Sequence, residues 1–282
     1  MLRATTLGLF GPLLLAQAAS STRTPPNSPP LNQTTSSTRG VGKEGDCQEV
    51  DKLPTKAFEP SGLSLRPSDG TLWAIDDNGF LAVYDSASMA LMYDQIATGL
   101  DDLEGLTFGP DTDMVYLAQE FPPTIFEFNV VHRALTGRSV ELPGFGGDAS
   151  HGMEGLAYAP PLDAFLAANQ DTGHVLLYKV DFEAGAAVLT MDYDLGWKED
   201  ASGLSWDPVN EWAVALSDSN NEMVAFDLAD GSIYWREDVP YDGQEGIAVE
   251  AGSVYIANDD GKNANVRKLR VKEDFSVDKD CF

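Results

Sequence analysis

A short phrase built around a glycine recurs five times along this chain. Its glycines are spaced 43, 50, 48 and 43 residues apart, and each is preceded by Ser or Glu and followed by Leu or Ile. A unit of roughly 40 to 50 residues that repeats at near-even spacing marks a repeat architecture. This periodicity constrains the fold more than any other feature of the sequence. The five glycines are Gly62, Gly105, Gly155, Gly203 and Gly246.

Each repeat contains short runs of β-branched and aromatic residues with turn-forming residues between them. In the first repeat the runs cover 61–65, 71–75, 80–84 and 89–96. Four antiparallel strands in about 45 residues form one propeller blade. We therefore predict an all-β fold over residues 47–282, a five-bladed β-propeller of four-stranded antiparallel blades. A six-bladed ring is the alternative if the N-terminal segment hides a degenerate blade. The five predicted blades start near residues 61, 104, 154, 202 and 245.

The first 46 residues have a different composition from the repeats. Residues 1–19 combine Arg3, a short apolar run and a small-x-small site, which predicts a secretory signal peptide. Residues 20–46 are rich in Ser, Thr, Pro and Asn, so we predict a disordered linker, with a glycosylation sequon at Asn32. The expected location is extracellular, with the periplasm or an endomembrane lumen as alternatives. An uncleaved anchor is the other interpretation of residues 1–19; otherwise we expect no transmembrane segment.

The two cysteines stand at opposite ends of the repeat region. They are Cys47 and Cys281. A propeller that closes its ring brings its chain ends together, and a secreted chain permits disulfides. We therefore predict that these two cysteines form a disulfide.

The chain is strongly acidic, with a formal net charge of -27. Nucleic acids and anionic membrane surfaces are bound by basic patches, so this charge argues against both. We expect a monomer whose partner is a small molecule or a protein on the channel face.

Oxygen-bearing side chains recur at two positions of the repeat. One is the residue before the glycine, and the other is the end of the second strand. Because these strands are antiparallel, both positions lie at the same end of each blade and converge on the channel mouth. Clustered carboxylates need a counter-charge, and Ca²⁺ accepts such oxygen ligands. The alternative is that the glutamates cap backbone N–H groups of adjacent blades. The predicted Ca²⁺ ligands are Glu104, Glu154, Glu245, Glu120, Asp218 and Asp259, and a secondary polar ring consists of Ser61, Ser202, Asp77 and Gln170.

Two structural expectations accompany the repeat. The glycines should let the innermost strands approach closely at a crowded axis. The apolar residue after each glycine should be buried, whereas Trp197 and Trp235 are candidates for exposed contacts. The five expected core equivalents are Leu63, Leu106, Leu156, Leu204 and Ile247.

The ordered set of Ser-Gly-Leu, Glu-Gly-Leu and Glu-Gly-Ile phrases resembles the SdiA-regulated, or YjiK-like, β-propellers. Supporting phrases are 202–208, 216–219 and 244–248, and the likeness covers about residues 56–272. The resemblance implies a five-bladed propeller with calcium at the channel and a distant likeness to NHL-repeat proteins and propeller phytases. Gln170 and Asp259 stand where that family tends to have Glu, which affects the expected ligand set.

Three functional hypotheses follow from these observations. The first is a calcium-binding propeller that binds a ligand or partner on its channel face. The second is a calcium-dependent hydrolase of the lactonase or phytase kind, for which His151 is a candidate base. A phytase is disfavoured because no Lys or Arg recurs beside the polar rings. The third is a structural or surface-coat protein. The sequence identifies no catalytic residue.

Overall fold

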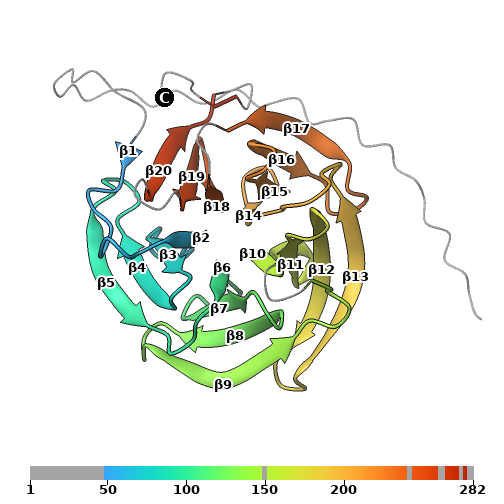
Figure 1. The fold of residues 1–282 in the computed structure, drawn as a ribbon, viewed down its shortest axis with the longest axis horizontal. Helices are drawn as coiled ribbons and strands as arrows, with labels where there is room; N and C mark the ends of the chain where they lie inside the picture. Colours follow the sequence, from blue (N-terminus) through green and yellow to red (C-terminus); the bar gives the residue numbers. More distant parts are fainter. Residues whose placement is uncertain (1–47, 148–150, 240–242, 260–263, 273–275, 278–282) are drawn as a thin grey trace, which may run out of the picture. The chain divides into compact units, whose positions relative to one another are not determined.

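The repeats form five four-stranded antiparallel sheets arranged around a central axis (Figure 1). The computed structural model describes residues 48–147, 151–239, 243–259, 264–272 and 276–277, all within one compact unit. The predicted five-bladed β-propeller is confirmed. The signal peptide, the linker, Asn32, Cys47 and Cys281 lie outside the described residues.

In the first four blades, the strands follow chain order from the axis outward. Blade 1 consists of β2 (Pro60–Leu65), β3 (Leu72–Asp76), β4 (Phe80–Tyr84) and β5 (Leu91–Ala97), and blade 2 of β6 (Leu103–Phe108), β7 (Met114–Gln119), β8 (Thr124–Asn129) and β9 (Ala134–Glu141). Blade 3 consists of β10 (Met153–Ala159), β11 (Ala164–Asn169), β12 (His174–Asp181) and β13 (Ala186–Asp194), and blade 4 of β14 (Gly203–Asp207), β15 (Trp212–Ser217), β16 (Glu222–Phe226) and β17 (Ile233–Asp238).

Blade 5 is assembled from both ends of the described chain. It contains β18 (Gln244–Glu250), β19 (Ser253–Asn258) and β20 (Asn265–Arg270), and its outermost strand is β1 (Gln48–Glu49). Gln48 pairs with Lys268 in the antiparallel register. Val277 forms an isolated bridge to Val271, so the C-terminal part of the described chain also belongs to this blade. The ring therefore closes by joining the two ends, which is the arrangement that the predicted disulfide requires.

The five repeat glycines form a tight ring around the axis. A Cβ on Gly155 would lie 3.0 Å from the Ser202 carbonyl oxygen and 3.1 Å from the Gly203 Cα. A Cβ on Gly246 would lie 2.8 Å from the Gly62 Cα, so the contact continues across the closure between blades 5 and 1. Such distances leave no room for a side chain without a backbone shift. The expected crowding of the innermost strands is confirmed.

The apolar residues that follow these glycines are all buried, as predicted. The exposed fractions of their side chains do not exceed 3% (Leu63, Leu106, Leu156, Leu204 and Ile247). The expectation for Trp197 was wrong. It packs among the buried residues between blades 3 and 4, and its indole N–H donates a hydrogen bond of 2.8 Å to Glu222. Trp235 is half-buried.

Helical structure is minimal in the part of the chain that the structure describes. It consists of one 3₁₀ turn, Pro160–Leu162. No helix there has the length and hydropathy needed to cross a membrane.

Candidate metal-binding face

The residue before the repeat glycine lies in a β-bulge in four of the five blades. The antiparallel register of the first two strands skips Ser61, Glu104, Glu154 and Glu245. A bulge bends the strand locally and redirects a side chain. The three glutamates accordingly line a small axial cavity of about 150 Å³, together with the repeat glycines.

Three carboxylates from blades 1 and 2 meet at the mouth of this cavity. Asp77, Asp102 and Glu104 each offer an oxygen, and these oxygens lie within 4.8 Å of one another. Asp77 follows β3, whereas Asp102 precedes β6 in a left-handed conformation with φ of 62°. The Asp102 N–H donates a hydrogen bond of 2.8 Å to the Asp77 carbonyl oxygen, which fixes the two segments relative to each other.

Burial and mutual repulsion disfavour the ionised forms of the ring glutamates. Burial raises the pKa of Glu104 well above its ordinary value, and the charges of Asp77, Glu245 and Glu120 raise it further. The pKa of Glu154 is raised mainly by burial and then by Glu104 and Glu245. Burial and the neighbouring carboxylates are thus the main causes of both shifts.

A second acidic group lies on the side of blades 4 and 5. Burial raises the pKa of Glu245 to about 8, and Asp218, Asp200 and Asp259 add repulsion. One Asp218 oxygen is already a hydrogen-bond acceptor, because Oδ1 receives the N–H of Gly243 at 2.6 Å and that of the next residue at 3.0 Å.

Glu120 combines a structural contact with a place beside the first acidic group. Its Oε1 accepts a hydrogen bond of 3.1 Å from the Gly152 N–H in the next blade. Its pKa is raised to about 6, first by burial and then by the nearby Asp102. One oxygen of Glu120 therefore caps a backbone N–H group of the adjacent blade, as the alternative to the calcium site expects of the glutamates. Asp218 makes a similar contact.

The secondary polar ring is only partly directed at the mouth. Asp77 belongs to the carboxylate cluster, and Ser61 donates a hydrogen bond that lowers the pKa of Glu104 slightly. The Ser202 hydroxyl instead donates a hydrogen bond of 2.7 Å to the carbonyl oxygen of Gln244, so it links blades 4 and 5. Gln170 lies at the equivalent strand end in blade 3, where its carbonyl oxygen accepts a backbone hydrogen bond from the entry to blade 4.

Sequence reasoning missed two acidic residues of this face, Asp102 and Asp200. Both lie two residues before the ring position, as Glu59 does in blade 1. Blades 3 and 5 have Gly152 and Gly243 there and carry their acid at the ring position instead. Every blade thus supplies at least one carboxylate at one of the two positions. That alternation is visible in the sequence once the repeats are aligned.

The donor set at this face suits a hard divalent cation. The cluster of Asp77, Asp102 and Glu104 offers only carboxylate oxygens, and Ca²⁺ accepts six to eight oxygen ligands in flexible geometry. His151 is exposed in the segment before β10 and is not part of this cluster.

Comparison with known proteins identifies a family that matches this chain. Residues 57–200, just over half of the chain, match the model of a family described as "Phytase-like: Esterase-like activity of phytase". No curated protein matches the chain.

Solved structures of low sequence identity are also similar to this chain. A Bacteroides thetaiotaomicron protein of unknown function is 17% identical with a TM-score of 0.53, covering 75% of this chain and 59% of its own. Virginiamycin B lyase from Staphylococcus aureus is 14% identical with a TM-score of 0.48, covering 82% of this chain and 72% of its own. At this identity the likeness to the Bacteroides protein concerns the fold alone.

Proposed function

Because the chain belongs to the phytase-like family, we propose that its acidic face binds one calcium ion and presents it to a ligand or partner. The observation that carries this proposal is the convergence of Asp77, Asp102 and Glu104 to within 4.8 Å. These three residues are the central ligands in the proposal. Glu120, Glu154, Glu245, Asp218 and Asp259 complete the acidic surroundings.

The electrostatics of the face support a cation more strongly than an empty polar channel. Glu104, Glu154 and Glu245 all have raised pKa values, so ionising them together is unfavourable in the metal-free protein. A divalent ion relieves this repulsion and restores the ionised forms as ligands. When bound, calcium also supplies a positive charge that attracts and polarises an oxygen atom of a ligand.

The bulged strands give the protein's own residues a positioning role. Bulges direct Glu104, Glu154 and Glu245 into the axial cavity, while the glycine ring beneath them fixes the distances between blades. A site built on rigid strands holds its geometry better than a site on loops. This arrangement suits a binding module that recognises an oxygen-rich ligand or a partner at the mouth.

A second candidate function is calcium-dependent ester hydrolysis, which the description of the family favours. Among the described residues, the side chains around the axial cavity include three glutamates and neither Lys nor Arg. Phosphate is commonly held by Arg and Lys side chains. A carboxylic ester or lactone is therefore a better candidate substrate class than a phytate-like polyphosphate.

We propose a monomer that acts outside the cytosol, after removal of residues 1–19. The narrower relationship to the SdiA-regulated propellers remains a prediction that rests on the repeated phrases around Ser61, Glu104, Glu154, Ser202 and Glu245.

Thermal unfolding with calcium and with a chelator tests the binding proposal. A ligand at about a hundred times its dissociation constant stabilises a protein by about 2.7 kcal/mol. For a domain of this size that corresponds to a rise in melting temperature of about 5 to 10 °C. The Glu104→Gln variant should lose most of this rise.

The control is Asp94→Asn on β5, an exposed carboxylate remote from the mouth, which should behave like the unmodified protein. Equal calcium shifts in both variants would contradict the assignment.

A panel of carboxylic esters and lactones separates the two candidate functions. The hydrolase would be established if turnover requires calcium, is abolished by chelation and is retained in the Asp94→Asn variant. Calcium binding without turnover of any ester would leave the binding module as the function of the face.

A further inference from the structure

A second, much larger cavity lies at the opposite end of the innermost strands. It encloses about 1460 Å³, including its open mouth, and is lined by residues from all five blades. The ring glutamates lie at the start of these strands, and the cavity is lined by residues near their ends. Glu104 and Phe108 are four residues apart, about 13 Å along a strand. We call this cavity the distal funnel.

The lining of the distal funnel repeats with the blades. The residue three positions after each repeat glycine contributes to its wall: Leu65, Phe108, Tyr158, Trp206 and Val249. The residue five positions after the glycine is a proline in four blades, and these prolines lie around the cavity: Pro67, Pro110, Pro160 and Pro208. Proline has a fixed φ, so the rim is stiff. The funnel is thus a regular product of the repeat, with an apolar wall that includes three aromatic residues.

Several polar groups of the wall already take part in hydrogen bonds, two of which link neighbouring blades. The Thr107 hydroxyl oxygen accepts a hydrogen bond of 3.0 Å from the Tyr158 N–H, which links blades 2 and 3. The Ser205 hydroxyl oxygen accepts a hydrogen bond of 3.1 Å from the Val249 N–H, which links blades 4 and 5. The Tyr158 hydroxyl donates a hydrogen bond of 2.7 Å to Asp163. These contacts leave chiefly apolar surface for a ligand.

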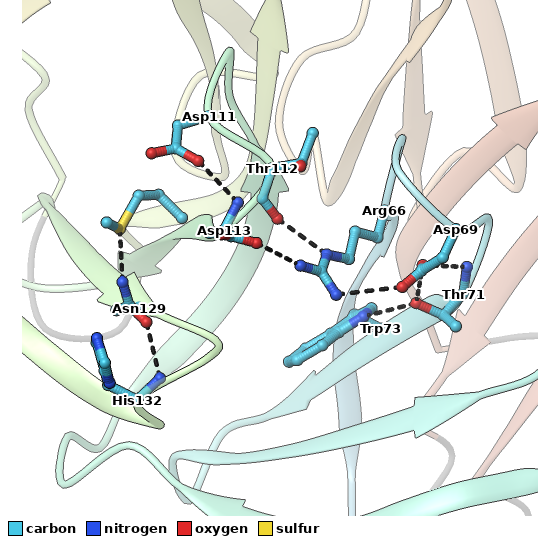
Figure 2. A network of polar contacts seen from close by, with 10 residues as sticks. Arg66, Asp69, Thr71, Trp73, Asp111, Thr112, Asp113, Asn129 and His132 are labelled. Carbon is cyan, nitrogen blue, oxygen red and sulfur yellow. Dashed lines mark hydrogen bonds and ion pairs between the residues drawn. The ribbon is translucent and has the colours of Figure 1, made fainter.

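The charged residues at the rim are paired within the protein. Figure 2 shows Arg66 between two aspartates, with Nη1 at 3.1 Å from Asp69 and Nη2 at 2.7 Å from Asp113. Glu250 lies 3.3 Å from the Lys268 ammonium group. Arg66 and Glu250 are the charged residues among those that line the funnel in the described chain. A charged ligand would find no unengaged counter-charge here, which favours an uncharged one.

From these observations we propose that the distal funnel binds an uncharged, largely apolar small molecule with a flat ring system. A concave, mostly apolar cavity with aromatic walls and few polar groups is typical of small-molecule sites. Aromatic side chains contact flat rings through stacked or edge-on arrangements. Leu63, Leu106, Leu156 and Leu204 line both cavities, so these buried side chains separate the funnel from the acidic mouth. This site is therefore independent of the proposed calcium function.

Fluorescence titration with N-phenyl-1-naphthylamine, an uncharged apolar dye, tests the proposal on the full chain. We expect saturable binding that is the same in calcium and in chelator. Two variants fill the funnel from neighbouring blades, Leu65→Trp and Val249→Trp. Each should weaken dye binding by at least about tenfold, because the larger side chain occupies space that the dye would fill. The matched control is Val188→Trp on β13, a valine with 62% exposure on an outer strand, which should bind the dye normally.

Three results would overturn the proposal. One is the absence of saturable binding to the unmodified chain up to the solubility limit of the dye. Another is equal binding to Val249→Trp and Val188→Trp when circular dichroism shows that both are folded. The third is a dimer of the unmodified chain in sedimentation, together with a monomer of the Val249→Trp variant. The funnel would then be a contact surface between two copies of the chain and not a small-molecule site.

Discussion

The stability of the metal-free protein should fall as the pH rises, because the folded state holds Glu245 in its protonated form. The pKa of this carboxyl is about 8 in the folded protein, compared with an ordinary value of 4.5. Between these values the folded state binds more protons than the unfolded state, so the free energy of unfolding decreases with pH. A difference of roughly 3.5 in pKa, at 1.36 kcal/mol each, sets an upper limit of about 5 kcal/mol for this single group. Glu104 and Glu154 act in the same direction.

Urea denaturation in chelator at a series of pH values from 5 to 8 measures this dependence. We expect a progressive loss of a few kcal/mol, and Glu245→Gln should reduce the loss because the amide cannot ionise. The control is Glu141→Gln on β9, an exposed carboxylate at the outer edge of blade 2, which should leave the profile unchanged. Saturating calcium should reduce the loss, since a bound cation favours the ionised form of the carboxylates around it. Stability in chelator that stays constant or rises over this range would refute the reasoning.

Three further predictions concern the ring and its closure. Gly155→Ala should destabilise the protein by about 1 to 3 kcal/mol, measured by urea denaturation, because its Cβ would lie 3.1 Å from the Gly203 Cα. Leu156→Ala should cost about 2 to 5 kcal/mol in the same assay, as expected for truncating a side chain that is 2% exposed. Cys47 and Cys281 should resist alkylation in the folded, non-reduced protein, and their reduction should cost about 4 to 5 kcal/mol because the linked loop is long; two alkylatable thiols would exclude the disulfide.

The sequence predicts the fold well because each blade repeats the same glycine-centred phrase and the same strand pattern. Five evenly spaced glycines determine the number of blades, and the alternating apolar residues determine which strand faces are buried. The expectation for Trp197 failed because its position between strands suggests exposure. In the structure the segment between blades 3 and 4 turns inward, where the indole meets Glu222.

The candidate site is harder to predict because its geometry depends on contacts between blades. The bulges that direct Glu104, Glu154 and Glu245 to the axis have no signature in the phrases themselves. Asp102 approaches Asp77 only because the entry of one blade hydrogen-bonds to the strand end of the preceding blade. Contacts of this kind link residues that no single repeat places together.

The central claim is that this acidic face binds calcium, and a calorimetric titration of calcium into the chelator-treated protein tests it most directly. We predict saturable binding of one ion, strongly weakened in the Asp102→Asn variant because the mutation neutralises one of three carboxylates that lie within 4.8 Å of one another. The Asp94→Asn control should bind as the unmodified protein does. No binding heat at millimolar calcium, together with an unchanged melting temperature, would contradict the claim and reduce the face to a polar channel lining.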